Sequence, residues 1–328
     1  MNILHLSETP LSGAPYRLMQ VQRAGGWNAR LISHRNSYDG RNTVFFPHDI
    51  LLQSNRSNKE KRLRPDFNRD DIYRLFNDAD ILHFHNYYTD QFIFRLFPDL
   101  KQYLSKKVVV AQYHSPRPSL KNVEKTLKDR NIARHLVVAQ YQVRQFPEAI
   151  PVFNAIPIYD ELHTPVPRNN CPPVIAYSPS NTHLRDWNNK GYPETMAVFD
   201  RLGSTCTPLV ITNTPHQECL RKKQIADIAI DEVVTGSYHL NTLEALSQGQ
   251  VAICGLDDQC EGVLRDLTGT EHHPIIKASP KTLQGLITTF IEEPSILQHM
   301  QIKSRMFMEQ YWSTEFLVDM YKKVYQSI

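Results

Sequence analysis

Short apolar segments alternate along this chain with longer segments in which apolar residues recur every three or four positions. The short segments have the length of buried parallel strands, and the longer ones have the period of amphipathic helices. In the first half we predict a helix over 16–24 and strands over 2–7, 29–33, 81–86, 107–112 and 135–139, with a short strand that ends at 153–154. In the second half we predict strands over 174–177, 208–212 and 251–254, one strand near residue 228, and helices over 192–202, 215–225, 262–266, 280–293, 294–310 and 314–327. This alternation predicts an α/β protein with two doubly wound, Rossmann-like domains and a ligand cleft between them.

A proline-rich stretch separates the two halves of the chain. Residues 156–173 contain five prolines and show little periodicity, as expected of a linker. At 328 residues the chain is also longer than the chains that usually fold around a single hydrophobic core. We therefore predict an N-terminal domain over 1–155, a linker over 156–173, a C-terminal domain over 174–310, and a final helix over 311–328 that returns toward the first domain.

Composition narrows the class of protein. The net charge of +3 is too small to indicate a nucleic-acid partner, and the five cysteines form no C-x-x-C pair that would indicate a disulfide framework or a zinc site. The G-x-G-x-x-G fingerprint is absent, so we expect no dinucleotide cofactor. No apolar stretch is long enough to span a bilayer, and residues 1–10 indicate a strand rather than a signal peptide. We therefore expect a soluble, cytoplasmic protein.

One local concentration of positive charge lies in a polar, ambiguous region that runs to about residue 71. Residues 56–64 carry five Lys or Arg and a single acid, and they follow an apolar segment at 50–52. Such a segment is typical of a solvated loop, but it can also lie on an anionic membrane surface or face a charged acceptor. Peripheral membrane contact through 56–64 stays open as an alternative.

Polar residues gather at the carboxyl ends of the predicted strands of the first half, where ligands of open parallel sheets bind. His83 and His85 share one face, and an H-x-H pair can bind a metal. No third ligand is evident nearby, so we expect one packed histidine, one residue that faces the site, and no metal. His85, Asn86 and His114 are candidate site residues, as is Gly13, where a glycine lets a ligand approach the backbone.

The stretch 233–249 carries the most specific signal of the second half. A small-residue turn at Gly236 precedes a predicted short helix, for which Asn241 and Thr242 offer capping side chains. A helix N-terminus presents backbone N–H groups and the positive end of the dipole, so it suits a phosphate. Glu244, about one turn into the helix, can accept hydrogen bonds from sugar hydroxyls beside that phosphate. A glutamate there is also a common surface residue that complements the dipole.

A polar loop over 178–191 opens the second domain. It delivers Arg185 and Lys190 just ahead of a predicted helix. Two cations beside a helix N-terminus suit a diphosphate, the arginine as a planar fork and the lysine as a point charge. Scattered charges on a surface loop are the alternative, and the presence of Glu244 in the same domain favours the binding site.

Two motifs of the second domain occur in a recognisable order. The chain reads R-x4-K-G over 185–191 and G-S-Y-H-L-N-T-L-E-A-L-S-Q-G over 236–249. This order resembles GT-B glycosyltransferases of the family 4 type, which have R-x4-K-G followed by E-x7-E with an L-E-A-M-A-x-G core. Looser matches in the first half are D-I-L-H-F-H at 80–85, V-V-V-A-Q-Y-H at 108–114 and F-N at 153–154. The resemblance covers most of the chain.

This resemblance implies an enzyme that moves a sugar from a nucleoside-diphosphate donor to a glycan, lipid-linked or small-molecule acceptor in glycan or glycoconjugate biosynthesis. It implies retention of configuration and no metal or other cofactor. The residues that it implies for donor binding are Arg185, Lys190, Tyr238, His239, Leu240, Asn241 and Glu244. The residues implied to take part in catalysis are His114, Arg185 and Lys190, and those on the acceptor side are Gly13, His85 and Asn86.

One position departs from the family pattern. The first Glu of E-x7-E, which contacts the donor sugar in the family, falls here on Gly236, with Tyr238 nearby. A glycine has no side chain to make that contact. Two alternatives therefore stay open: a nucleotide-sugar-binding protein without transfer activity, and a nucleotide-sugar 2-epimerase of the same fold.

Overall fold

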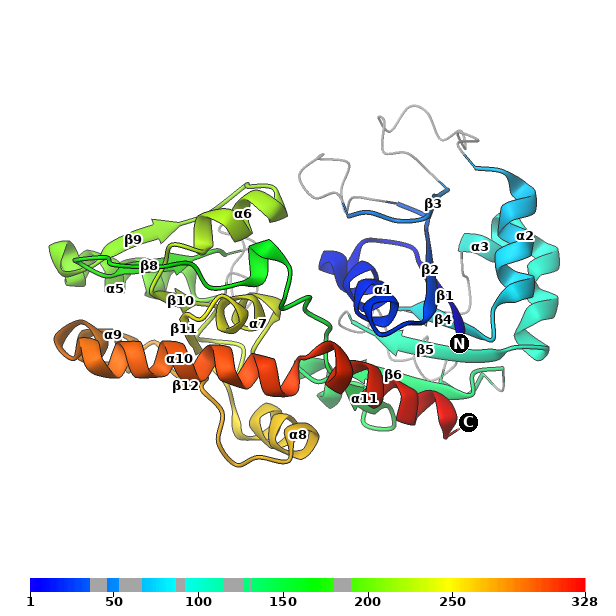
Figure 1. Ribbon diagram of the computed structural model, residues 1–328. Helices are drawn as coiled ribbons and strands as arrows, with labels where there is room; N and C mark the ends of the chain where they lie inside the picture. Colours follow the sequence, from blue (N-terminus) through cyan, green and yellow to red (C-terminus); the bar gives the residue numbers. More distant parts are fainter. Residues whose placement is uncertain are drawn as a thin grey trace. The chain divides into compact units, whose positions relative to one another are not determined.

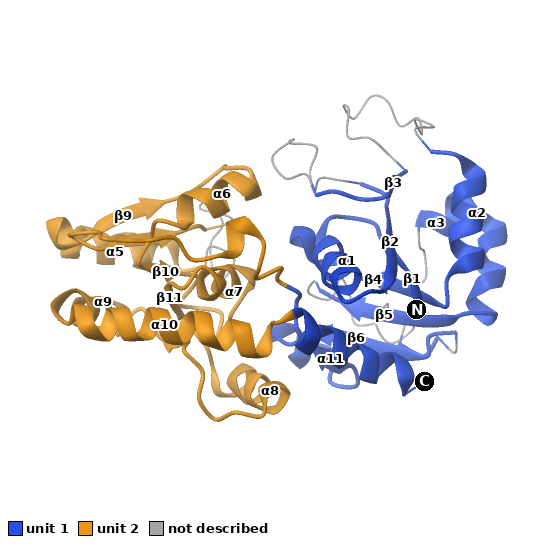
Figure 2. Ribbon diagram, viewed as in Figure 1, with its two compact units in different colours: residues 1–155, 314–328 blue, residues 156–313 orange. Residues whose placement is uncertain are grey.

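The structure is a computed structural model that describes residues 1–35, 46–52, 67–86, 92–114, 127–129, 131–179 and 190–327. The described chain forms two compact units (Figure 2). Unit 1 comprises residues 1–155 together with 314–328, and unit 2 comprises residues 156–313. Each unit is built on a sheet whose paired strands are all parallel, so the prediction of an α/β protein with two Rossmann-like units is confirmed. The basic segment 56–64 and Arg185 lie outside the described residues.

Unit 1 contains a seven-stranded parallel sheet in the order β3-β2-β1-β4-β5-β6-β7 (Figure 1). Its strands are β1 Asn2–Ser7, β2 Asn28–Ser33, β3 Ile50–Leu51, β4 Ile81–His85, β5 Val108–Tyr113, β6 Arg134–Val138 and β7 Ile150–Val152. Its described α-helices are α1 Ala14–Ala24, α2 Arg69–Asp78, α3 Phe92–Leu96 and α11 Thr314–Gln326. The central strands are buried on both faces, as expected for a parallel sheet covered by helices.

Helix α11, the last helix of the chain, belongs to unit 1 and is held there by two buried tyrosines. The Tyr321 hydroxyl donates to the carbonyl of Phe153 at 3.2 Å and also bonds the side chain of Gln112 in β5. The Tyr325 hydroxyl lies 2.7 Å from Nδ1 of His83 and accepts from the Gln22 amide of α1 at 3.2 Å. The C-terminal helix therefore completes the packing around the first strands of the sheet.

Unit 2 contains a five-stranded parallel sheet in the order β12-β11-β10-β8-β9. Its strands are β8 Val174–Tyr177, β9 Thr207–Val210, β10 Ile228–Ile230, β11 Val251–Cys254 and β12 Ile276–Lys277. Its described α-helices are α5 Tyr192–Leu202, α6 His216–Lys223, α7 Leu240–Ser247, α8 Asp258–Thr268, α9 Leu283–Glu292 and α10 Pro294–Tyr311. The apolar side chains of the central strands pack with those of α5 and α9 into one core.

Most predicted elements appear within a few residues of their predicted bounds, but several were missed. The region up to residue 71 was left ambiguous, yet α2 begins at Arg69. Its N-cap residue Asn68 accepts the backbone N–H of Asp70 at 3.0 Å. The two-residue edge strands β3 and β12 and the five-residue helix α3 were also not predicted. Elements this short carry too little periodicity to be recognised in a sequence.

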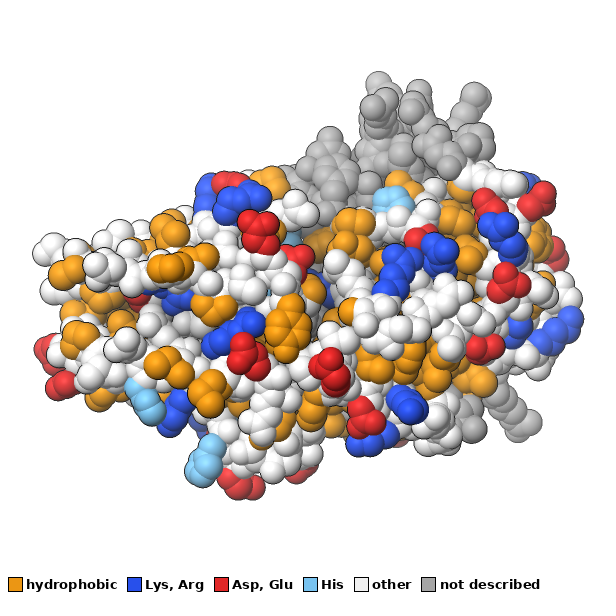
Figure 3. All heavy atoms as spheres, viewed as in Figure 1, with side chains coloured by type: hydrophobic (Ala, Val, Ile, Leu, Met, Phe, Trp, Pro, Cys, Tyr) orange, Lys and Arg blue, Asp and Glu red, His pale blue; other side chains and the backbone are white. Residues whose placement is uncertain are grey.

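The surface carries charges of both signs. On the face drawn in Figure 3, Lys and Arg side chains are interspersed with Asp and Glu across the described residues. No helix among the described residues is long and apolar enough to cross a membrane.

Candidate functional site

The loop between β10 and α7 lies at the carboxyl end of a central strand of unit 2. Strand β10 ends at Ile230, Asp231 and Glu232 follow directly, and α7 begins at Leu240. The carboxyl ends of the strands are where ligands of open parallel sheets bind. The predicted donor-binding residues 238–244 all lie in this loop and in the first turns of α7.

Asp231 organises the start of α7. Its carboxylate accepts the backbone N–H of His239 at 2.8 Å and the hydroxyl of Thr242 at 2.7 Å, and Lys190 Nζ lies 3.5 Å away. Burial by itself raises the pKa of this carboxyl, but the positive charge of Lys190 and the contact with His239 outweigh it and hold the pKa well below its ordinary value. Asp231 is therefore a fixed negative charge under the loop.

Glu232 folds the loop that follows. Its buried carboxylate accepts backbone N–H groups of Val234, Thr235 and Ser237. The backbone N–H of His239 is likewise engaged by Asp231. A carboxylate of the protein therefore already accepts from this N–H, and the part of His239 in donor binding stays a prediction.

Glu244 sits within a buried cluster of charges rather than on an open surface. Its two carboxylate oxygens lie 2.7 Å from Lys223 Nζ and 2.8 Å from His216 Nε2, and its side chain is 7% exposed. The alternative of an exposed residue that only complements the dipole is therefore excluded. A carboxylate can accept about four hydrogen bonds, and Lys223 and His216 each supply one donor.

Asn241 is held by the same cluster. Its side-chain oxygen accepts from Lys223 Nζ at 2.6 Å and from the Ser178 hydroxyl at 3.0 Å, and its amide group donates to the carbonyl of Ile230 at 3.3 Å. The prediction that Asn241 and Thr242 cap the helix is wrong. The helix begins earlier, with His239 as its N-cap residue. The Thr242 hydroxyl bonds Asp231 instead, and the Asn241 side chain has the partners given above.

Lys190 stands immediately before α5 with a positive φ of 58°, and Gly191 follows with a φ of 75°. A Cβ on Gly191 would lie 2.8 Å from the Val233 side chain, so only glycine allows this close approach to the loop. The turn brings Lys190 Nζ to Asp231, which in turn contacts α7. The structure therefore brings Lys190 to the start of the helix that carries Glu244.

Tyr238 and Leu240 flank the N-cap residue of α7. The Tyr238 ring is fully buried, and burial raises the pKa of its hydroxyl well above the ordinary range. Its side chain therefore belongs to the core of unit 2, and Leu240 is the first helical residue.

In unit 1, His114 follows β5 and is fixed through its neighbours. Its backbone N–H donates to the Asn86 side chain at 2.7 Å, its carbonyl accepts from Gln142 at 2.7 Å, and its Nε2 lies 2.9 Å from Nδ1 of His85. Burial lowers the pKa of His114 to about 3, although its contact with Asn154 opposes the shift. His114 is therefore a neutral imidazole at pH 7.

The two histidines of the H-x-H pair do not differ in exposure as we expected. We expected one histidine to pack and the other to face the site, but His83 and His85 are 0% and 1% exposed. Asn86, with a φ of 54°, uses its side chain to hold the backbone of His114. His85 contacts His114 through its Nδ1 at 2.9 Å.

Gly13 is the N-cap residue of α1 and has a φ of 80°. A Cβ added there would lie 2.2 Å from a ring carbon of Phe46. The conformation and the close approach both require glycine. The neighbour that comes closest to Gly13 is thus an aromatic ring of the protein.

Replacing Gly255 with alanine is expected to destabilise the loop under α7. Gly255 follows β11 and donates its N–H to the Glu232 carbonyl at 2.7 Å, and an added Cβ would lie 2.9 Å from the carbonyl carbon of Val233. Such overpacking costs about 1–3 kcal/mol. Thermal denaturation measures the loss.

Gly262→Ala is the matched control for this substitution. Gly262 lies inside α8, and a Cβ there meets no atom within 4 Å. Alanine is favoured over glycine inside a helix by about 1 kcal/mol, so this variant should be as stable as the wild type or slightly more stable. Equal melting temperatures for the two variants would contradict the close approach.

The whole chain is similar to solved structures of glycosyltransferases. A glycosyltransferase from Rickettsia africae ESF-5 is 11% identical, with a TM-score of 0.64 over 99% of this chain and 98% of that one. Anabaena Alr3699/HepE in complex with UDP is 10% identical, with a TM-score of 0.62 over 100% of both chains. This chain has the GT-B fold.

The GT-B fold is the one that the resemblance in the sequence implied, so that prediction is confirmed. Sucrose-phosphate synthase from Thermosynechococcus elongatus is a further similar structure, 11% identical, with a TM-score of 0.57 over 100% of this chain and 99% of that one. No family model and no curated protein matches the chain. The likeness is one of fold, and the roles of individual residues in this GT-B chain stay predictions.

Four residues that bond the candidate site residues of the two units were not predicted from the sequence. In unit 2 they are Asp231, His216 and Lys223, and in unit 1 the residue is His5. Lys223 is three positions after the buried Leu220 in α6, which was a signal that it shares the buried face. Asp231 follows a buried strand directly, which is where site residues of parallel sheets occur.

Proposed function

We propose that this chain is a glycosyltransferase that moves a sugar from a nucleoside-diphosphate donor to a glycan, lipid-linked or small-molecule acceptor. The observation that carries the proposal is the convergence of Lys190, Asp231 and Glu244 around the start of α7 in a chain with the GT-B fold. The structures of Anabaena HepE with UDP and with UDP-glucose support a nucleotide sugar as the donor class.

Lys190 is the proposed cation for the donor diphosphate. Its 3.5 Å contact with Asp231 is at the outer limit of a hydrogen bond, so no short bond fixes the ammonium group when a phosphate approaches. Asp231 keeps its contacts with His239 and Thr242 when this happens. Arg185 is proposed as the second cation because of its place in the R-x4-K-G motif.

Glu244 is the proposed partner of the ribose hydroxyls. Lys223 and His216 hold the carboxylate in one orientation, which lowers the entropy cost of ordering it when the nucleotide binds. Sugar hydroxyls donate well to an ionised carboxylate, and such bonds are stronger than neutral ones.

The proposed transfer proceeds with retention of configuration and without a metal at the donor. The diphosphate leaving group gains negative charge as its bond to the sugar breaks. Fixed cations and oriented backbone N–H groups stabilise that charge more in the transition state than in the ground state. His114, neutral and held by Asn86 and His85, is proposed to take part in catalysis.

Binding of a nucleotide sugar without transfer is the second candidate, and Gly236 favours it. The residue has a φ of 74°, which glycine adopts readily and a glutamate does not. The backbone at this position therefore suits glycine in its own right, and the donor sugar lacks the carboxylate contact that the family motif supplies. An epimerase that needs no acceptor is a third candidate.

Glu244→Gln should weaken the binding of UDP or GDP, measured by calorimetry without acceptor. The loss of one hydrogen bond to a charged group costs about 1.5–3 kcal/mol, or about 10- to 150-fold in Kd. Glu218→Gln is the matched control, since Glu218 is exposed on α6 and pairs with Arg221. Unchanged affinity in Glu244→Gln, with the variant folded, would remove the ribose assignment.

The three candidate functions differ in their products. Incubating the protein with labelled nucleotide sugars and candidate acceptors should yield a labelled glycan or glycoside if it is a transferase. A 2-epimer of the donor without acceptor would instead indicate the epimerase, and recovery of intact donor despite tight binding would indicate the binding protein.

A further inference from the structure

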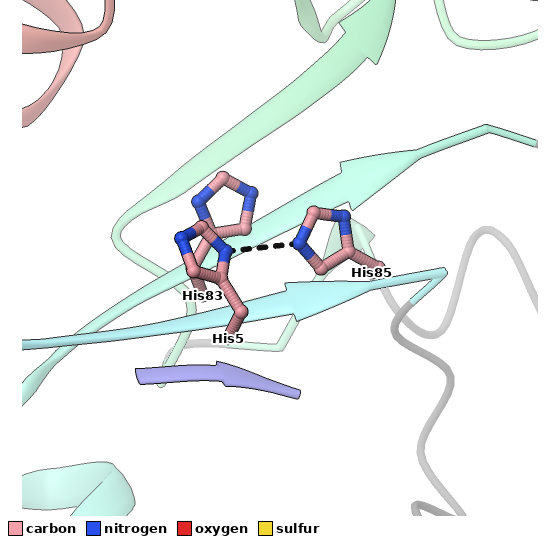
Figure 4. Close-up of side chains that lie close together, drawn as sticks. All are labelled: His5, His83 and His85. Carbon is pink, nitrogen blue, oxygen red and sulfur yellow. Dashed lines mark hydrogen bonds between the residues drawn. The ribbon is translucent and has the colours of Figure 1, made fainter. Parts of the chain in front are cut away.

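Three buried histidines meet in unit 1, apart from the proposed donor-binding residues (Figure 4). His5 lies on β1, and His83 and His85 lie on the neighbouring strand β4. In the parallel register His5 is paired with His83, and residues two apart on a strand point to the same face. All three side chains are at most 1% exposed. The sequence prediction found no third ligand beside the H-x-H pair, and the structure supplies one in His5.

One ring nitrogen of each histidine points into the cluster. A nitrogen from each of the three rings lies within 4.8 Å of the others, and His5 Nδ1 is 3.0 Å from His85 Nε2. The rings of His83 and His85 stack with centroids 4.7 Å apart. His83 Nε2 is buried and has no hydrogen-bond partner among the described residues. A buried imidazole nitrogen without a partner is costly unless something binds it.

The other ring nitrogen of each histidine points outward to a polar partner. His5 Nε2 lies 2.7 Å from Gln22 Oε1, His83 Nδ1 lies 2.7 Å from the Tyr325 hydroxyl, and His85 Nδ1 lies 2.9 Å from His114 Nε2. Histidines that bind metals almost always donate their second ring N–H to a partner of this kind, which fixes the ring and its tautomer. Each of the three outward nitrogens has a partner that can accept such a proton.

The tautomer of His5 agrees with ligation. The Gln22 side-chain oxygen can only accept, so His5 carries its proton on Nε2 and has a lone pair on Nδ1, which faces the cluster. His5 Nδ1 therefore accepts from His85 Nε2 in the metal-free chain, and a metal ion would take the place of that proton.

We propose that His5 Nδ1, His83 Nε2 and His85 Nε2 form a structural site for one transition-metal ion of the zinc class. Imidazole ligands suit Zn²⁺, Cu²⁺ and Ni²⁺, whereas Mg²⁺ and Ca²⁺ require oxygen ligands. A Zn–N bond of about 2.0–2.1 Å in tetrahedral geometry sets ligand nitrogens about 3.4 Å apart. In this cluster one pair of nitrogens is 3.0 Å apart, and all three lie within 4.8 Å of one another. The fourth position is open to a water or hydroxide that enters with the ion.

The site would act as a cross-link within unit 1. Its ligands join β1 to β4, and their outward partners Gln22, Tyr325 and His114 connect it to α1, α11 and the end of β5. Binding to the folded state alone raises stability by mass action. The proposed donor-binding residues around α7 take no part in this site, whereas His85 connects it to His114.

Metal content and spectroscopy of the untagged protein test the proposal. The protein is expressed with added Zn²⁺ or Co²⁺, desalted, and measured for metal per chain and for melting temperature. We expect about one ion per chain, a higher melting temperature with metal, and the intense visible bands of tetrahedral Co²⁺. X-ray absorption should show nitrogen ligands with imidazole scattering.

His83→Gln and His5→Gln should each lower the retained metal at least about 10-fold, and His135→Gln should leave it unchanged. His135 lies on β6 of the same sheet, where it bonds Tyr113, outside the cluster. A wild-type protein without retained metal or thermal shift, equal retention in His83→Gln, or sulfur ligands in the X-ray absorption spectrum would overturn the proposal. The spectra of the wild type decide the matter if the variants fail to fold.

Discussion

Replacing Lys223 with methionine is expected to destabilise unit 2 by about 3–5 kcal/mol, because it leaves the Glu244 carboxylate buried without its principal cation. Lys223 Nζ bonds both Glu244 and Asn241, and its side chain is 1% exposed. Methionine preserves the length of the side chain but supplies no donor. Hydrogen exchange measured by mass spectrometry should show the protection of α6 and α7 falling by about 100-fold or more.

The neighbouring Lys222 provides the matched control. Its side chain is 48% exposed and lies 3.9 Å from Glu218, one turn earlier on the same helix. An exposed pair of this kind contributes about 0.3–0.5 kcal/mol, so Lys222→Met should leave the exchange of α7 unchanged. If Lys222→Met and Lys223→Met behave alike, the buried pair does not stabilise the helix.

A double substitution separates two free energies. One is the cost of leaving the Glu244 carboxylate buried without its cation, and the other is the net contribution of the Lys223–Glu244 ion pair to stability. Replacing a whole buried ion pair by apolar residues is often close to neutral, whereas removing one partner is costly. Lys223→Met combined with Glu244→Leu should therefore recover part of the protection lost in Lys223→Met alone. The same double variant should bind UDP no better than Glu244→Gln, because the proposed ribose contact is absent.

Asp231→Asn is expected to lower the stability of unit 2 by about 3 kcal/mol at pH 7. The amide keeps the shape of the carboxylate, but it removes the charge that faces Lys190 and leaves one acceptor for the His239 N–H and the Thr242 hydroxyl. Differential scanning calorimetry measures the loss, and nucleotide affinity should fall with it because the start of α7 shifts.

The effect of Asp231 should depend on pH in a defined direction. Its pKa in the folded chain is lowered relative to the unfolded chain, in which an aspartate titrates near about 3.9. The carboxylate therefore contributes its full stabilisation above that value and loses it as the pH falls toward the folded pKa. The difference between wild type and Asp231→Asn should be constant from pH 6 to 8 and shrink below about pH 4.

An exposed aspartate gives the contrast for this prediction. Asp258 pairs with Lys277 at 3.0 Å, but its side chain is 99% exposed. Asp258→Asn should change the melting temperature little at any pH, since solvent screens such pairs. A pH-independent difference between wild type and Asp231→Asn would contradict the assignment of a lowered pKa.

The alternation of strands and helices was enough to predict the two units and most of their elements. Buried parallel strands such as β8 and β11 are continuous apolar runs, and the prediction matched the bounds of both. Helix α2 was missed because the segment is only 10 residues long and only Ile72 and Phe76 of it are buried. Its N-cap Asn68 and the acids of its first turn were the remaining signals.

The candidate site was predicted only in part. Local sequence patterns do not show which elements, far apart in the chain, contact one another. Glu244 was recognised from its place on α7, but its cation Lys223, one of three consecutive basic residues at the end of α6, was not. His5 became a neighbour of His83 only through the sheet order, which puts β1 beside β4. Neither pairing follows from spacing along the chain.

Unit 2 is a continuous insertion within unit 1. The two segments of unit 1 are therefore translated before and after the whole of unit 2. Residues 156–313 are all translated before α11. Until α11 has been made and has left the ribosome, the strands of unit 1 lack Tyr321 and Tyr325, which bond Phe153 and His83 in the folded unit. The native packing of unit 1 thus requires a segment that is translated after the whole of unit 2.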